Sequence, residues 1–550
     1  MKVMSRILMT VWLVGRGTAV SGAVPAIESI TPGAVRPGVV TEVIVRGSGL
    51  KNVSEVWKSF TAEALVLPDK SSEDGKSATL RITTPAETQV GVVTLRVMGK
   101  NGVSNPFLMM IDDLPSVAPP NGIASIEKAV KLDWPVAVDG VCDDSYSDFY
   151  RVKLRRGRRV AIECVAQRIG SQLDPLLRLY DVDGRQVAGN DDGAGIGADA
   201  RLSFIPRATG EYTVEVRDSI HEKGKAHRYR LRVGAFPFAT LAFPLGGEPE
   251  AGIEPVFLGT ELEDAGSVKL TMRSDASRQR IGVPGKKGGG SGFVSMVADA
   301  LPDVVEIEPN NLPEQTTRVS PPVAINGRFE TRRDRDCYEF KAGKGDALAF
   351  VGQTRSLGSP SALHVRLFDS KGKLLKQADV TGANEAGLTN RFAADGIYRL
   401  QLEELTHAGG PSHGYRMEVR PWTPGFRLSV TSDTTNAKAG ASFDIKVDAL
   451  RDKGFAEPIT LSVEGLWEDA TLEGEVIAKD KKDTKIKITL PKEVEVGGWR
   501  QIKIVGRAKS GDEELRAVAS TMPALRKRFP EMPFPPVDLD GKVTVGVRGD

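Results

Sequence analysis

The chain has 550 residues, which exceeds what one hydrophobic core supports and suggests roughly three to six domains. Lysine and arginine (74) nearly balance aspartate and glutamate (72), so the composition lacks the basic excess of a nucleic-acid-binding protein. Glycine (58) and proline (33) are spread along the whole chain, as is typical of turns between many short strands.

The chain begins with the features of an export signal. Lys2 and Arg6 give a positive start, residues 7–14 form a short apolar stretch, and small residues precede Ala23. We therefore predict a signal peptide over residues 1–23 and a secreted, periplasmic or cell-surface location; a miscalled start of the chain is the alternative. No later run reaches the roughly 18 apolar residues of a membrane span, so no transmembrane segment is expected.

Alternation of polar and apolar residues recurs along the chain, and such alternation is typical of half-buried β-strands. Turn dipeptides such as Asp183-Gly184 and Lys371-Gly372 punctuate the chain, whereas helical periodicity is hard to find. We therefore predict an all-β, multidomain chain of tandem antiparallel β-sandwiches with little helix. Representative segments are 41–45 (TEVIV), 211–216 (EYTVEV), 399–402 (RLQL) and 485–489 (KIKIT).

Two long segments of the sequence match each other at an offset of 186 to 188 residues. The matches keep their order and nearly keep their spacing, which chance does not easily produce. The matched pairs are Gly140 and Gly327, Asp148-Phe-Tyr150 and Asp336-Cys-Tyr338, Asp181 and Asp369, Gly184 and Gly372, Gly210-Glu-Tyr212 and Gly396-Ile-Tyr398, and Tyr229-Arg230 and Tyr415-Arg416.

These motifs resemble the bacterial pre-peptidase C-terminal (PPC) domain, which shows a D-x-[YF] strand, an aspartate–glycine turn and a late G-x-Y strand. The resemblance covers residues 125–236 and 304–421. It implies two jelly-roll-like β-sandwiches of a kind that occurs beside secreted peptidases and in collagen-binding or polysaccharide-associated modules.

Further β-modules are expected around the two copies. Residues 24–113 resemble the IPT/TIG immunoglobulin-like (Ig-like) domain in their Pro32-Gly33, Gly38 and Gly47-x-x-Leu50 pattern. Residues 237–303 repeat this pattern in degenerate form and include a glycine-rich stretch, 284–292, which we predict to be a flexible linker, as we do for 114–122. Residues 422–521 resemble another Ig-like sandwich, and the proline-rich residues 522–550 are predicted to form an extended tail.

The sequence lacks the motifs of common catalytic sites, so we expect no enzyme. His221-Glu222 begins like a zinc-protease motif, but Lys225 stands where the second zinc ligand belongs. The cysteines lack zinc-ligand spacing; they are expected to be buried thiols, with a Cys142–Cys164 disulfide as the alternative. Four histidines occupy repeat-equivalent positions and are expected to be structural: His221, His227, His407 and His413.

The best candidate for a ligand-binding site is the run from Glu306 to Asn311, because carboxylate and amide oxygens suit calcium. Alternation places Glu306 and Glu308 on one face of a strand. The run also resembles the linker that binds calcium in collagen-binding PPC members. By that resemblance the ligands are Glu306, Glu308, Asn310, Asn311 and Asp336. Arg333 departs from the pattern, since those members place an aspartate there, and a solvated acidic linker is the alternative.

Together these observations favour a secreted, non-catalytic protein for binding or adhesion at the cell envelope or in the extracellular matrix. Its partner would be a polysaccharide or a protein, with calcium as the one cofactor to consider and no nucleic acid. Two other functions remain open. One is an accessory component of a secreted peptidase system, and the other is a spacer or surface-layer protein.

Overall fold

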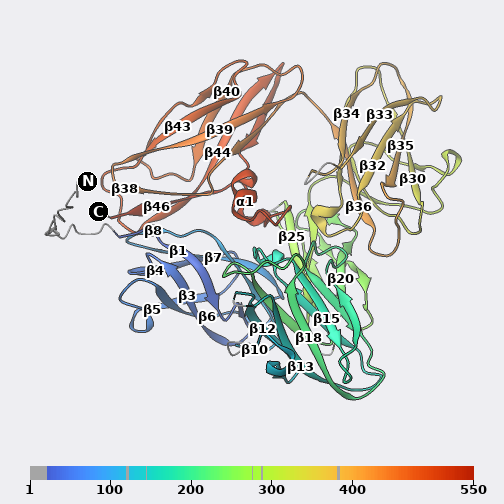
Figure 1. Ribbon diagram of the computed structural model, residues 1–550. Coiled ribbons are helices and arrows are strands. Elements are labelled where there is room, and N and C mark those ends of the chain that lie inside the picture. Colours follow the sequence, from blue (N-terminus) through green and yellow to red (C-terminus); the bar gives the residue numbers. More distant parts are fainter. Residues whose placement is uncertain are drawn as a thin grey trace, which may run out of the picture.

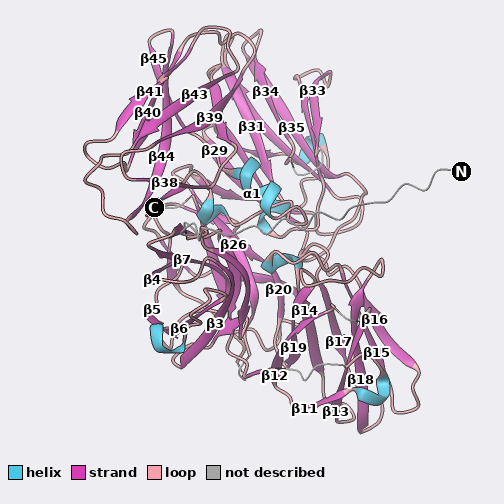
Figure 2. Ribbon diagram, turned by 60° about the vertical axis from the view of Figure 1, so that its left-hand side comes forward, coloured by secondary structure: helices cyan, strands magenta, loops and turns pink. Residues whose placement is uncertain are grey.

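The computed structural model describes residues 22–118, 123–143, 145–274, 277–286, 289–380 and 384–549, so nearly all of the predicted signal peptide lies outside the described residues. Five β-modules surround the short helix α1 (Met522–Arg528) near the centre of the molecule (Figure 1). Strands dominate every module (Figure 2), which confirms the all-β prediction. Within the described ranges, no helix has the length and apolar character of a membrane span. The 3-10 turns are Pro68–Lys70, Ile126–Lys128, Gln167–Ile169, Pro313–Gln315, Arg355–Leu357 and Val537–Leu539.

The first module is a sandwich of two sheets. Its strands are β1 (Ala26–Thr31), β2 (Ala34–Val35), β3 (Val40–Ser48), β4 (Val53–Lys58), β5 (Glu63–Leu67), β6 (Ser77–Thr83), β7 (Gly91–Gly99), β8 (Gly102–Val103) and β9 (Phe107–Ile111). One sheet has the order β1-β3-β6-β5 and the other β2-β9-β7-β4, with β8 beside β7. Alternation along β3 sends Val43 and Val45 into the core, where Leu95 and Val97 of the facing sheet meet them.

The second module contains the first copy of the repeat. Its strands are β10 (Ser116–Val117), β11 (Val130–Leu132), β12 (Val136–Val141), β13 (Ser147–Leu154), β14 (Val160–Val165), β15 (Pro175–Tyr180), β16 (Gln186–Asn190), β17 (Ala200–Phe204), β18 (Gly210–Asp218) and β19 (Arg228–Gly234). They form two five-stranded sheets, β10-β12-β19-β14-β17 and β11-β13-β18-β15-β16. The module begins before residue 125, because β10 pairs in parallel with β12.

The fourth module contains the second copy and has the same strand order in both sheets: β27-β29-β36-β31-β34 and β28-β30-β35-β32-β33. Its strands are β27 (Asp303–Val305), β28 (Thr317–Arg318), β29 (Val323–Arg328), β30 (Arg335–Ala342), β31 (Ala347–Gln353), β32 (Leu363–Phe368), β33 (Leu374–Asp379), β34 (Gly387–Arg391), β35 (Gly396–Glu404) and β36 (Gly414–Pro421). The repeated sequence motifs therefore correspond to a repeated topology.

The repeated motifs meet inside each of these two modules. In the second module the Tyr150 and Tyr229 hydroxyls lie 2.6 Å apart, and Tyr229 donates to Asp148 over 2.6 Å. A Cβ at Gly140 would lie 2.2 Å from the Tyr229 ring, so only glycine fits opposite this tyrosine. In the fourth module the same contacts join Tyr338, Tyr415, Asp336 and Gly327. The shared D-x-Y and glycine motifs thus have a structural role.

The third module corrects the prediction of a flexible glycine-rich linker at 284–292. Its strands are β20 (Phe238–Phe243), β21 (Gly246–Gly247), β22 (Gly252–Ile253), β23 (Val256–Thr260), β24 (Leu270–Thr271), β25 (Arg278–Val283) and β26 (Ser291–Ala298). Strand β26 starts within the predicted linker and pairs with β25 and β21. Residues 287–288 lie outside the described part, but Gly290 is held by hydrogen bonds to Asp113 and Arg232.

The fifth module corrects the prediction of an extended tail. It contains β37 (Phe426–Val430), β38 (Thr434–Lys438), β39 (Ser442–Arg451), β40 (Ile459–Glu464), β41 (Thr471–Glu473), β42 (Val476–Ile477), β43 (Asp483–Thr489), β44 (Trp499–Ser510), β45 (Glu513–Val518) and β46 (Val543–Arg548). Strand β46 comes from the predicted tail and lies between β38 and β44. Val543, Val545 and Val547 are buried, which explains why this short apolar run completes the sheet.

The rest of the tail packs between modules. Leu525 and Phe529 of the α1 region are buried against Val92 and Met110 of the first module and Ile169 of the second. The first and last modules also contact each other directly, where β8 meets β38 and β46 (Figure 1). The Asn436 amide bonds both the N–H and the carbonyl of Val103, over 2.7 and 2.9 Å. The chain therefore closes on itself instead of forming an open string of modules.

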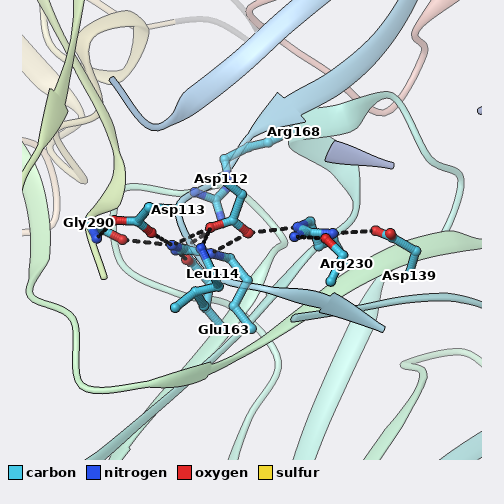
Figure 3. Close-up of polar contacts among 10 residues, drawn as sticks. Asp112, Asp113, Leu114, Asp139, Glu163, Arg168, Arg230 and Gly290 are labelled. Carbon is cyan, nitrogen blue, oxygen red and sulfur yellow. Dashed lines mark hydrogen bonds and ion pairs between the residues drawn. The ribbon is translucent and has the colours of Figure 1, made fainter. Parts of the chain in front are cut away.

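A buried ion network joins the first three modules (Figure 3). Asp112, at the end of the first module, accepts from Arg230 over 2.7 Å and from Arg232 over 3.1 Å, and all three side chains are almost fully buried. Arg232 also bonds Glu163 over 2.9 Å and the Gly290 carbonyl over 2.7 Å. These arginines hold the pKa of the Asp112 carboxyl below its usual value against the opposing effect of burial.

The equivalent arginine fixes the next junction. Arg416 corresponds to Arg230 in the repeat and bonds Asp299 over 2.9 Å as well as Asp303. Both carboxylates lie where the third module passes into the fourth. The structure therefore holds both junctions by burying an arginine of the repeat against carboxylates from the preceding chain segment.

We expect Asp112→Ala to destabilise the protein by about 3–5 kcal/mol, because Arg230 and Arg232 would stay buried without the carboxylate that they share. Chemical denaturation of the full chain measures this loss. The matched control is Asp183→Ala in an exposed turn, where Arg185 is the only ion-pair partner among the described residues and the expected change is below about 1 kcal/mol. Equal effects of the two substitutions would contradict a structural role for the network.

Candidate metal centre

Three carboxylates converge where the third module passes into the fourth. Glu306 and Glu308 follow β27, which pairs in parallel with β29, and Asp336 is the second residue of β30. One carboxylate oxygen from each lies within 4.8 Å of the others. In the described part of the chain, this is the one group of three or more His, Cys, Asp or Glu side chains with metal-ligand spacing. The two glutamates do converge, but not by strand alternation as predicted, because β27 ends at Val305 and both residues follow it.

The protein provides only part of the hydrogen bonding that these carboxylates require. Glu306 accepts from the Arg328 N–H over 2.6 Å and from the Tyr415 hydroxyl over 3.2 Å. Glu308 accepts the Asn310 N–H over 2.9 Å. Buried oxygens nevertheless remain without a partner, Oε1 of Glu308 and Oδ1 of Asp336. A buried acceptor without a donor destabilises the fold, so these oxygens are available to a cation.

The two predicted amide ligands behave differently. Asn310 is fully buried, and neither its Oδ1 nor its Nδ2 has a hydrogen-bond partner. Asn311 instead accepts the backbone N–H of Arg335 over 3.1 Å, so its side chain holds the loop. The structure therefore groups Glu306, Glu308 and Asp336, leaves Asn310 with an unused buried oxygen, and gives Asn311 another role.

The first copy of the repeat shows how unusual the burial of Asn310 is. The Asn310 carbonyl accepts from the N–H of Cys337, and the Ile123 carbonyl accepts from the N–H of Phe149, both over 3.1 Å. The two positions are thus equivalent, yet one buries an isoleucine and the other an amide without a partner. An apolar residue fits this frame without penalty, so the amide indicates a ligand for the second copy.

Electrostatics also favours a cation at this site. Burial, followed by repulsion from neighbouring carboxylates, raises the pKa of Asp336 well above its usual range, and burial likewise raises the pKa of Glu306. Burial raises the pKa of Glu308 in the same direction. Packed carboxylates of this kind hold protons until a positive charge replaces them. The side chain of Arg335, next to Asp336 in sequence, pairs with Glu403 and therefore does not neutralise these carboxylates.

The donor set fits calcium, which prefers six to eight oxygen ligands. Glu306, Glu308 and Asp336 would hold the ion, and the Asn310 oxygen would add a neutral ligand. Bound there, calcium would supply a positive charge that bridges the segment entering the fourth module to strand β30. Sequence reasoning missed Tyr415, whose hydroxyl donates to Asp336 and lies within hydrogen-bonding distance of Glu306, although the repeat had already marked this tyrosine.

The other candidate residues serve the fold. Cys142, Cys164 and Cys337 are buried and free. Burial raises the pKa of the Cys337 thiol to about 11, which keeps it protonated. His221 and His407 adopt positive φ in equivalent turns, and the described residues contain no carboxylate or cysteine cluster that would complete a histidine metal site.

No family model and no curated protein matches the chain. Among solved structures, the chain is similar to the pre-peptidase C-terminal domain of a collagenase from Bacillus anthracis, with 16% identity, coverage of 19% of this chain and 93% of that chain, and a TM-score of 0.16. The Clostridium thermocellum CbhA fibronectin(III)-like modules match with 15% identity, 38% and 91% coverage, and a TM-score of 0.12. Domains 1–6 of the surface layer protein SbsC match with 11% identity, 90% and 54% coverage, and a TM-score of 0.13. At these scores the likenesses carry no conclusion about function.

We expect calcium to remove a pH dependence of stability that the metal-free protein shows. Raised carboxyl pKa values mean that the metal-free fold favours protonated Glu306 and Asp336, so this contribution is present at low pH and is lost as pH rises through the folded-state pKa values. With chelator, the Tm should therefore fall from about pH 4, near the unfolded-state pKa values, to about pH 9, whereas millimolar calcium should remove the fall. Identical Tm profiles with and without calcium would argue against the site.

We expect Asn310→Ile to stabilise the metal-free protein by about 1–3 kcal/mol, because it removes an unsatisfied buried amide. The same substitution should weaken calcium binding, measured by calorimetry on the full chain, and Glu306→Ala should abolish the binding isotherm. The reciprocal control is Ile123→Asn, which should lower stability equally with calcium and with chelator. A loss of stability in Asn310→Ile under chelator would show that the amide serves the fold alone.

Proposed function

We propose that this protein is a secreted, non-catalytic binding protein of the cell envelope or extracellular matrix, with calcium bound at the entry to its fourth module. The observation that carries the proposal is the group of buried, unsatisfied oxygens around Glu308, Asn310 and Asp336. Calcium outside cells is abundant enough to occupy the modest sites of extracellular modules. The predicted export signal supports the same location.

The use of the reactive side chains supports a non-catalytic role. Asp148 and Asp336 hold tyrosines in equivalent cores, and the three cysteines lie buried inside sandwiches. The buried arginines are used to join modules. These groups stabilise the molecule, and surfaces of the sandwiches remain for recognition of a polysaccharide or protein.

The closed arrangement favours a binding protein over a spacer. A spacer separates its two ends, whereas here Arg96 of the first module pairs with Asp433 of the last over 3.1 Å, with both side chains buried. Asp433 also pairs with Arg528 of α1 over 2.7 Å. An accessory role in a secreted peptidase system is compatible with the same architecture. Identifying the partner as a peptidase, or instead as a polysaccharide or matrix protein, would distinguish that role from a binding role.

The purified full chain should bind at least one immobilised polysaccharide or matrix protein in calcium, with weaker binding in chelator and in Glu306→Ala. It should not hydrolyse casein, collagen or glycans under the same conditions. An Asp148→Asn variant, altered in the equivalent core of the first copy, serves as the control and should keep the calcium dependence. Hydrolysis of any of these substrates by the pure chain would refute the non-catalytic proposal.

A further inference from the structure

A cavity of about 170 Å³ lies where the second, third and fourth modules meet the C-terminal segment. Each of the three modules contributes arginine to its wall: Arg168 and Arg201 from the second, Arg278 and Arg280 from the third, and Arg355 from the fourth. Met532 to Pro535 close the remaining side. A concave site that several modules build together is a common place for a ligand.

Two of these arginines have no ion-pair partner among the described residues. Arg201 donates to the Ala194 carbonyl over 2.9 Å and lies 4.9 Å from the centre of the Phe238 ring. Arg278 donates to the Ser356 carbonyl and to Gln353, over 3.1 and 3.0 Å. Desolvation lowers the pKa of Arg201 to about 10 and also lowers the pKa of Arg278. Glu163 attracts Arg201, and Glu385 and Glu418 attract Arg278, but the desolvation outweighs this attraction.

One of the two carboxylates on the cavity wall is already bound by other arginines. Glu163 is already shared between Arg168, over 2.8 Å, and Arg232, over 2.9 Å. The other acidic wall residue, Glu531, is exposed. Arg168 also pairs with Asp199 over 2.6 Å, and Arg280 lies 3.9 Å from Asp538. The positive charge that an anion would balance is therefore mainly that of Arg201 and Arg278.

A larger cavity of about 1050 Å³ adjoins the first and shares Arg278, Ser356 and part of the C-terminal segment with it. More basic side chains face this outer chamber, namely Arg273, Arg427, Lys503, Arg526 and Lys542. Of its acidic residues, Glu385 accepts the Ser356 N–H over 2.8 Å and Asp540 accepts the Thr521 N–H over 2.7 Å. The third acidic residue, Asp538, lies 3.9 Å from Arg280. Six basic side chains therefore face three carboxylates in the outer chamber.

We propose that the two cavities form a binding site for a phosphorylated or sulfated ligand. One tetrahedral oxyanion group occupies the inner cavity that Arg201 and Arg278 line, and further anionic groups extend into the outer chamber. Guanidinium groups suit this class because their N–H pairs match the spacing of two oxyanion oxygens. The site is independent of the calcium centre, which lies at the entry to the fourth module.

Calorimetry on the full chain tests the proposal with sodium phosphate, sodium sulfate and tripolyphosphate, at ionic strength matched with chloride. Tripolyphosphate should bind about tenfold more tightly than a single oxyanion, since further groups reach the outer chamber. Tighter binding of phosphate than of sulfate would assign a phosphorylated ligand, and the reverse a sulfated one. No heat of binding for all three anions would overturn the site.

Arg201→Gln and Arg278→Gln should each weaken tripolyphosphate binding about tenfold or more, because each removes a charged donor. The matched control is Arg185→Gln in an exposed turn, which should bind as the unmodified chain does. Thermal denaturation without anions separates this role from a structural one. The Tm of Arg278→Gln should be equal to or higher than that of the unmodified chain, since the substitution removes a buried charge that no ion pair compensates. A large fall in Tm, or unchanged binding in both variants, would contradict the proposal.

Discussion

The burial of arginine at the module junctions is the interaction on which this architecture depends. Arg230, Arg232 and Arg416 are almost fully excluded from water, and each is stable there only because carboxylates meet it. Asp112, Asp299 and Asp303 come from the chain segments that precede these modules, whereas Glu163 lies on a neighbouring strand of the same module. Separating the modules would leave these buried charges without their partners. The ion pairs therefore stabilise one relative orientation of the modules, which an apolar contact would fix less strictly. The described residues of both predicted linkers are therefore part of the folded structure.

The two copies of the repeat share one frame but differ in the segment that enters it. Both copies of the repeat have one strand order and one Tyr–Tyr–Asp arrangement in the core. They differ at the segment that enters each module, where Ile123 in one corresponds to Asn310 in the other. Duplication thus preserves the contacts that hold the sandwich, while the entering segment of the second copy carries acidic side chains that favour a cation.

Closure of the chain creates features that no single module has. The C-terminal segment returns to the first module, places α1 at the centre and forms one wall of the arginine-lined cavities. Strand β46 completes a sheet although it begins more than 30 residues after its neighbour β44 ends. The charge excess in the centre arises because modules distant in sequence each contribute basic side chains to the same space.

The sequence by itself determined the all-β class, the internal repeat and the acidic run at Glu306 and Glu308, because strand alternation and short motifs are local properties. It did not reveal that β46 belongs to a sheet, that Gly290 is held by hydrogen bonds, or that the Asn311 side chain accepts a hydrogen bond from Arg335. These features depend on partners elsewhere in the chain. Asp112 and Arg232, 120 residues apart, became an ion pair only through packing. Tertiary structure decided which charges are buried together, because the energy of a charge depends on its surroundings in space and not on its neighbours in sequence.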